Sequence, residues 1–114
     1  MADIVTVTQK PVRHSIAEKQ NLRLAVDVSA YDELDLLLTV YESSGGGSIT
    51  VKIITGMQIE SDIGWIDVAS FAATAANAAN KQNFKNFLRY IRYELITGST
   101  TTTFLVNGVG RKWA

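Results

Sequence analysis

Side chains that commonly carry out chemistry are sparse in this sequence. There is one histidine, His14, and there is no cysteine. Without a thiol, disulfides, thiolate catalysis and cysteine metal sites are excluded, and a site built from several histidines is excluded too. No recognised motif places a serine or a carboxylate cluster beside His14 as a catalytic partner. We therefore expect no enzyme, no catalytic residue, no cofactor and no bound metal.

Two acidic clusters contain the oxygen ligands that calcium prefers. The first contains Asp32, Glu33 and Asp35, and the second contains Glu60, Asp62 and Asp67. Neither spacing matches a calcium loop, and no motif places two carboxyl groups across a cleft as glycoside hydrolysis requires. We interpret both clusters as solvated turns and strand edges.

The glycines at positions 45–47 lie in the stretch SSGGGS. A phosphate-binding loop needs a helix N-terminus directly after its glycines, whereas a β-branched run, ITVKIIT, follows here. Glycine also supplies the positive φ angles of tight reversals. The pattern predicts a β-hairpin between residues 33–42 and 48–55.

The stretch FLRYIRYELI, residues 87–96, alternates aromatic, cationic and aliphatic side chains. As a strand it turns Ile91, Tyr93 and Leu95 toward the core, and Tyr90, Arg92 and Glu94 toward the opposite face. A single-stranded nucleic-acid platform combines stacking aromatics with unopposed positive charge. Glu94 beside Arg92 instead indicates cross-strand pairing and cation–π contact.

The charges of the whole chain balance. Eleven basic and eleven acidic residues give a formal net charge of zero, so no global field attracts phosphate backbones or anionic lipid. This balance disfavours nucleic acid and membrane as partners. It suits a subunit of an assembly, because long-range repulsion between copies is absent.

Alternating apolar and polar residues, typical of half-buried strands, recur along most of the 114 residues. We expect strands at residues 3–8, 22–29, 33–42, 48–55, 65–71, 87–97 and 104–113, with a loop at 56–64. The alanine-rich segment 72–83 is predicted to be a surface connection with at most one helical turn. The expected fold is an antiparallel β-sandwich or jelly roll of about seven or eight strands.

One domain is expected, comprising residues 21–114, preceded by an N-terminal arm or edge strand at residues 1–20. The arm either extends onto a neighbouring molecule or belongs to the domain as a loose tail or edge. No basic region followed by an apolar stretch begins the chain, and no run of about 18 apolar residues occurs. We expect a soluble product of the cytosol that does not enter a membrane.

Several apolar residues are predicted to point outward from their strands, namely Leu37, Tyr41 and Ile54. Large exposed apolar groups on adjacent strands call for a partner, unless a loop of the same chain covers them. Tyrosine and arginine are enriched at the energetic centres of protein interfaces. The candidate interface residues are Ile4, Val5, Val7, Leu37, Tyr41, Tyr90, Arg92 and Glu94, and we expect Leu37 and Tyr41 to lie beside Tyr90, Arg92 and Glu94 on one sheet face.

The stretches YDELDLLLTVYE, ITVKIITGMQIESDIGWIDVASF and FLRYIRYELITGSTTTTFLVNGVGR together resemble small β-sandwich structural proteins of tailed-bacteriophage virions. The resemblance spans about residues 22–113. It implies a capsid decoration or cement protein, or another head or tail accessory, located in the virion after synthesis in the host cytoplasm. It further implies contact with a major capsid or other virion protein, and a homo-oligomer, with a trimer favoured.

The strand order is also similar to that of galactose-binding-like jelly rolls. In that family, loops at one end of the sandwich hold sugars. The alternative function is therefore a carbohydrate-binding module or receptor-binding domain. No sugar-binding residue of that family is carried over, but within this alternative we expect Trp65 and nearby polar side chains to stack on a sugar ring.

Overall fold

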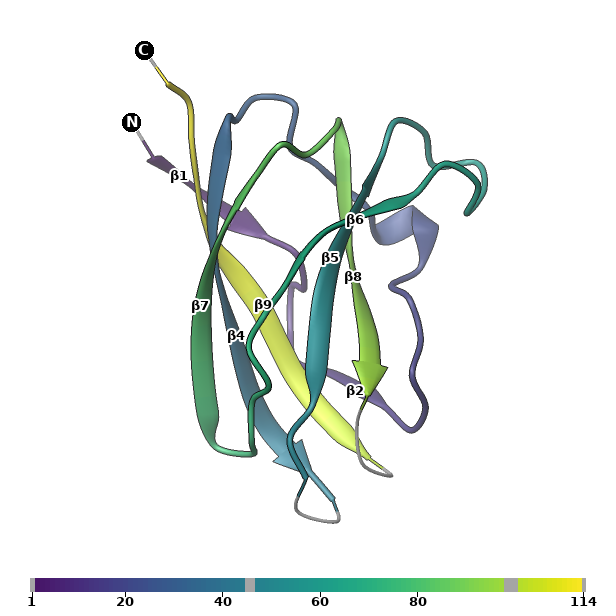
Figure 1. Cartoon of the computed structure of the whole chain (residues 1–114), viewed down its shortest axis with the longest axis vertical. Coiled ribbons are helices and arrows are strands. Elements are labelled where there is room, and N and C mark those ends of the chain that lie inside the picture. The colour runs from purple at the N-terminus through teal and green to yellow at the C-terminus, as the bar shows by residue number, and fades with distance from the viewer. Residues whose placement is uncertain (1, 45–46, 98–100, 114) are drawn as a thin grey trace.

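Two antiparallel sheets packed face to face form a β-sandwich (Figure 1). The computed structural model describes residues 2–44, 47–97 and 101–113. The strands are β1 (Ala2–Thr6), β2 (Val12–His14), β3 (Val26–Asp27), β4 (Glu33–Ser43), β5 (Thr50–Gly56), β6 (Ile66–Ser70), β7 (Ala78–Lys85), β8 (Tyr90–Thr97) and β9 (Thr102–Arg111). The predicted all-β sandwich is confirmed.

Sheet A has the strand order β1-β9-β4-β7, with β2 pairing to the same edge of β9 as β1. Sheet B has the order β3-β8-β5-β6. The core lies between the sheets, and its rows come from alternate residues of the longer strands. In β4, for example, Leu34, Leu36, Leu38 and Val40 are fully buried, as the period of two predicts.

The predicted hairpin between β4 and β5 is wrong. β4 pairs with β7 and β9 in sheet A, whereas β5 pairs with β6 and β8 in sheet B. The connection between β4 and β5 therefore crosses from one sheet to the other, although Gly45 and Gly46 lie outside the described residues. Both strands have a fully buried apolar row, and these rows fill one core when the strands face each other across it.

The long strand predicted at residues 22–29 is also wrong. Leu22–Leu24 form a 3-10 turn, η1, whose first turn is capped by Asn21: its side-chain oxygen accepts a hydrogen bond from the Arg23 N–H at 2.9 Å. Only Val26 and Asp27 pair with β8. Local capping at Asn21 thus interrupts an alternation that looked continuous.

The alanine-rich segment was predicted correctly only in its first half: residues 72–77 connect β6 to β7 without a helix, whereas residues 78–83 belong to strand β7. After a turn at Asn77, whose φ is 62°, β7 pairs with β4 over eight residues, from Ala78 to Lys85. Asparagine tolerates this left-handed conformation, which reverses the chain. Pairing along β4, together with burial of Phe84, outweighs the weak helical preference of alanine.

Residues near the N-terminus form one edge of sheet A, where β1 pairs with β9. The side chains of Val5 and Val7 are each 3% exposed and belong to the core. The Gln20 side chain donates a hydrogen bond to the Val7 carbonyl at 2.8 Å, which ties this segment to the next. In the described part of the chain, no helix is long and apolar enough to cross a membrane.

Candidate interaction surface

The outward side chains of sheet A form a grid on the face of the sandwich that lies away from the core. Alternation in β4 turns Asp35, Leu37 and Thr39 to this face. The register places Leu37 between Asn107 of β9 and Lys81 of β7. Each outward residue therefore has known cross-strand neighbours.

Apolar side chains run diagonally across this grid. Ile4 is opposite Val109, Leu105 is opposite Thr39, and Leu37 lies diagonally between Val109 and Leu105. Ile4 is 82% exposed, Leu37 39% and Tyr41 47%. We call Ile4, Leu37, Tyr41, Leu105 and Val109 the outer strip. Its exposed members form an apolar surface of the kind that a partner protein covers.

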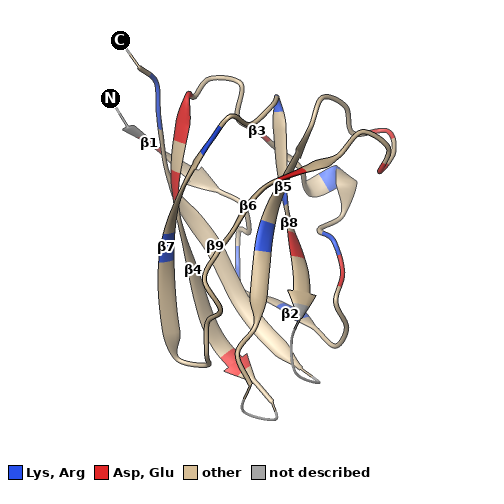
Figure 2. Cartoon of the chain, viewed as in Figure 1, with Lys and Arg blue, Asp and Glu red and all other residues tan. Residues whose placement is uncertain are grey.

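Charged residues of β4 lie toward the two ends of the strand and leave its centre apolar (Figure 2). At one end the Asn83 amide donates to Glu33 at 3.0 Å and to Asp35 at 2.8 Å, and Arg111 pairs with Asp35. The hydrogen bond from Asn83, and then one from the Trp113 indole, lower the pKa of Glu33. On the neighbouring strands Lys81 and Asn107 lie beside Leu37, so this face mixes apolar with polar side chains, as many protein interfaces do.

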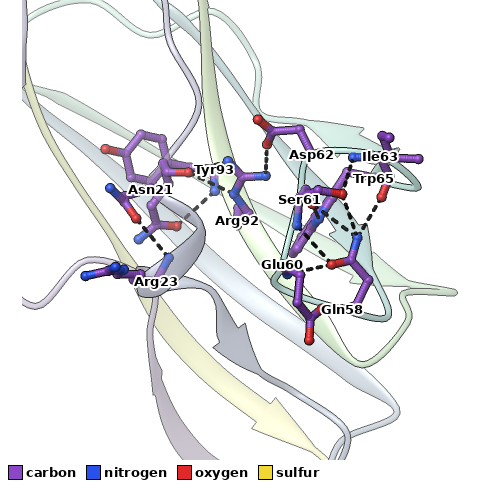
Figure 3. A network of polar contacts seen from close by, with 11 residues as sticks. Asn21, Arg23, Gln58, Glu60, Ser61, Asp62, Ile63, Trp65, Arg92 and Tyr93 are labelled. Atoms are coloured by element: carbon purple, nitrogen blue, oxygen red, sulfur yellow. Dashed lines mark hydrogen bonds and ion pairs between the residues drawn. The ribbon is translucent and has the colours of Figure 1, made fainter.

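Sheet B presents a different face, because the chain itself covers the middle of it, although Ile96 of β8 is 36% exposed there. Arg92 is only 2% exposed. Its guanidinium donates two hydrogen bonds to the Gln20 carbonyl, at 2.8 and 2.6 Å, and one to Asp62 at 2.8 Å (Figure 3). The segment before η1 pairs with the edge of β8 at Lys19 and Glu94, and Arg92 holds both this segment and the loop at 57–65. Ile54, predicted to be outward, is buried on the same face.

Trp65 is part of this cover. Its ring lies over Gly56, where an added Cβ would approach the indole to 2.8 Å, and the Arg92 guanidinium carbon is 4.8 Å from the ring centroid. The indole N–H donates to the Ser61 carbonyl at 3.1 Å (Figure 3). The side chain expected to stack on a sugar thus fastens its own loop.

Tyr90 and Glu94 are partly exposed at the margin of this cover. The Arg89 guanidinium lies over the Tyr90 ring at 5.1 Å. Lys52 of β5 pairs with Glu94 at 3.6 Å and with Asp67 of β6 at 2.8 Å. The expected cross-strand pairing and cation–π contacts are confirmed, and both are internal to the chain.

The expected interface residues consequently fall into three groups. Ile4, Leu37 and Tyr41 lie on the open face of sheet A, whereas Tyr90, Arg92 and Glu94 belong to the opposite face. The expectation that Leu37 and Tyr41 lie beside Tyr90 and Arg92 is wrong, because β4 and β8 belong to different sheets. Val5 and Val7 lie in the core, so their side chains have no surface to offer a partner.

His14 takes part in a short hydrogen-bonded chain that sequence reasoning did not identify. Its Nδ1 is 2.5 Å from Glu18 and its Nε2 is 2.6 Å from the Tyr93 hydroxyl. Burial, and then the charge of Glu18, raise the pKa of Tyr93 to about 12. The His14 ring lies between the Tyr93 hydroxyl and the Glu18 carboxylate and forms a structural link between β2 and β8.

This hydrogen-bonded link does not by itself form a metal site or a catalytic site. Among the residues that the structure describes, no group of three or more histidine, aspartate or glutamate side chains could hold a metal ion. The Tyr93 hydroxyl is a poor nucleophile at neutral pH, because ionisation is shifted well above its ordinary range. We therefore take the outer strip, and not the His14 link, as the candidate functional site. Sequence reasoning missed Leu105 and Val109 of this strip, although the alternation in TTFLVNGV predicts that both point outward.

Comparison with protein-family models, with curated proteins and with solved structures finds no match to this chain. The resemblance to virion proteins therefore stays a prediction from the sequence.

Proposed function

We propose that this chain is a non-enzymatic structural protein of a bacteriophage virion, of the capsid decoration or cement type. One observation carries the proposal. The middle of the outer face of sheet B, at Ile54 and Arg92, is covered by the chain itself, whereas the outer strip leaves Ile4, Leu37 and Tyr41 exposed on sheet A. A face with several uncovered apolar side chains supports a role in protein–protein contact.

In this proposal the outer strip contacts a major capsid protein or another virion protein. The copies also associate with one another, as a trimer, and bridge neighbouring capsid subunits against the pressure of packaged DNA. The contact gains free energy from burying the strip, and the zero net charge removes a barrier to close approach of copies.

The first experiment tests location. Phage particles are induced from the organism that encodes this chain, purified on a density gradient and analysed by mass spectrometry. The proposal expects this chain in the particle fraction at a stoichiometric level, and with the heads after heads and tails are separated. Its absence from purified particles, while it is present in the lysate, contradicts the proposal.

The second experiment tests the surface by co-sedimentation of purified chain with heads that lack it. Leu37→Asp puts a charge at the centre of the outer strip and should lower binding at least tenfold. Ile63→Asp is the matched control, because Ile63 is equally apolar and highly exposed but lies in the 57–65 loop. Equal binding by the two variants would exclude the outer strip as the interface.

The carbohydrate-binding alternative has weaker support, because the Trp65 N–H and part of its ring are already engaged. It is tested by titrating simple glycans against Trp113→Phe, in which Trp65 is the remaining tryptophan. A saturable change of Trp65 fluorescence would favour sugar binding over the virion proposal.

A further inference from the structure

A cavity of about 460 Å³ lies where the edge of sheet A meets the edge of sheet B. One wall is the connection from β1 to β2, and the other is η1 and the start of β3. A second depression of about 450 Å³ shares Lys10, Val12, Leu24 and Tyr93 with the first. We call the two together the edge groove. Cavities that hold small ligands have similar volumes, about 300–1,000 Å³.

The interior of the edge groove is apolar. Val12, Leu24, Val26 and the Tyr93 ring line the first cavity. Leu24 is 61% exposed, which is unusual for a leucine beside a cavity of its own chain. The predicted strand at 22–29 would have buried it, but η1 turns it toward solvent at the groove. An apolar body placed there would cover Leu24 and remove it from water.

The rim of the groove is basic. Residues 10–23 contain four basic side chains, Lys10, Arg13, Lys19 and Arg23, and one acidic side chain, Glu18, and all five residues line the edge groove. Two of these charged side chains already have partners: the Glu18 carboxylate is hydrogen-bonded to His14, and Arg13 forms an ion pair with Glu42 at 3.8 Å.

The other three cations of the rim are available to a ligand. In the described part of the chain, Lys10, Lys19 and Arg23 make no ion pair with a carboxylate. Three unpaired cations around one groove are a local excess, because the chain as a whole is neutral.

We propose that the edge groove binds an amphipathic anion: an apolar body that lies against Val12, Leu24 and Tyr93, with a carboxylate, sulfonate or phosphate head held by Lys10 and Arg23. The ligand's head group should be negatively charged because the rim of the groove is basic, and its body should be apolar because the lining of the groove is apolar. The site is separate from the outer strip, so it does not depend on the proposed virion function.

The test uses 8-anilinonaphthalene-1-sulfonate, an aryl sulfonate whose fluorescence rises when its body leaves water. The dye is titrated against the folded full-length chain, and decanoate is then added as a competitor with a different body and head. Saturable one-to-one binding that decanoate reverses is expected. No binding, or binding that decanoate leaves unchanged, overturns the proposal.

Substitutions in the edge groove test whether the dye binds there. Lys10→Gln with Arg23→Gln should weaken binding at least tenfold, and Leu24→Ser should weaken it by about the same factor through the apolar wall. Lys81→Gln with Lys112→Gln is the matched control, because it removes two exposed cations far from the groove in sequence and should change affinity less than twofold. All three should melt within a few degrees of wild type, since the altered side chains are exposed. Equal affinity of the first double variant and its control overturns the site.

Discussion

The Arg92 guanidinium lies 4.8 Å from the centre of the Trp65 indole ring, and this contact fastens the 57–65 loop to β8. Arg92 projects from β8, and Trp65 ends the loop that begins after β5. On its other side Arg92 holds the Gln20 carbonyl. One buried cation therefore fastens the 57–65 loop and the segment before η1 to the same strand.

Arg92→Ala should lower the free energy of unfolding by about 3 kcal/mol, because it leaves a buried carbonyl without its donors and removes the support of Trp65. Urea denaturation followed by tryptophan fluorescence measures this loss. Arg92→Lys keeps the charge but cannot reproduce the paired donors, so it should fall between wild type and alanine.

Asp62→Asn is the matched control for Arg92. The Asp62 side chain is mostly exposed, so its ion pair with Arg92 should contribute less than about 1 kcal/mol. If Asp62→Asn destabilised the chain as much as Arg92→Ala, the ion pair and not the Gln20 carbonyl would be the main contact.

Tyr93 predicts an alkaline dependence of stability. Its pKa is raised to about 12 in the folded chain, whereas the pKa of a tyrosine in an unfolded chain is about 10. Between these values the unfolded chain releases the phenol proton and the folded chain keeps it. The Tyr93 contribution should thus be fully present below about pH 10 and fall by about 1.4 kcal/mol per pH unit up to about 12.

Urea denaturation at several pH values from 9 to 12 measures this dependence in wild type and in Tyr93→Phe. Lysines and other tyrosines titrate in the same range, so the difference between the two slopes is the informative quantity. Equal slopes would mean that Tyr93 ionises in the folded chain as readily as in the unfolded one.

Gly108 of β9 pairs with Leu36 of β4. A Cβ at this position would be 1.9 Å from the Asp35 carbonyl oxygen, and a paired backbone cannot move away without breaking the ladder. Gly108→Ala should therefore cost about 3 kcal/mol or more. Gly47→Ala is the control, because no atom lies within 4 Å of its added Cβ; thermal melts should separate the two, and similar melting temperatures would contradict the close approach.

Deletion of residues 2–8 should destabilise the sandwich severely. The deletion removes Val5 and Val7 from the core, at about 1.5–3 kcal/mol for each buried side chain, and exposes the edge of β9. Ile4→Ser changes the same strand at its outward face and should cost less than about 0.5 kcal/mol. Circular dichroism melts compare the two, and a truncated chain that melts like wild type would show that β1 is dispensable.

Strand faces were predictable wherever a long strand alternates without interruption. β4 and β8 show this, because Leu34, Leu36 and Leu38, and likewise Ile91 and Leu95, are buried as the period of two requires. Prediction of the strands failed where a single local contact changes the backbone, as the Asn21 cap does at residues 22–24. It also failed where pairing with a distant strand overrides a weak helix propensity, as at residues 78–83.

The candidate surface was only partly predictable. Outward placement of Leu37 and Tyr41 followed from alternation, but Arg92 is also outward in that sense and is nevertheless buried. Alternation reports which way a side chain leaves its own strand. It does not report whether another segment lies on top, because that depends on residues 20 and 57–65, which are distant in sequence.

The sequence by itself determined the class of fold and the direction of most strand side chains, because both depend on the local period of apolar residues. Tertiary structure alone decided that the glycine-rich connection joins two sheets, that Arg92 and Ile54 on sheet B are covered whereas Leu37 on sheet A is exposed, and that an edge groove with a basic rim exists. These features depend on which strands pair, and strand pairing is set by burying all the apolar rows in one core.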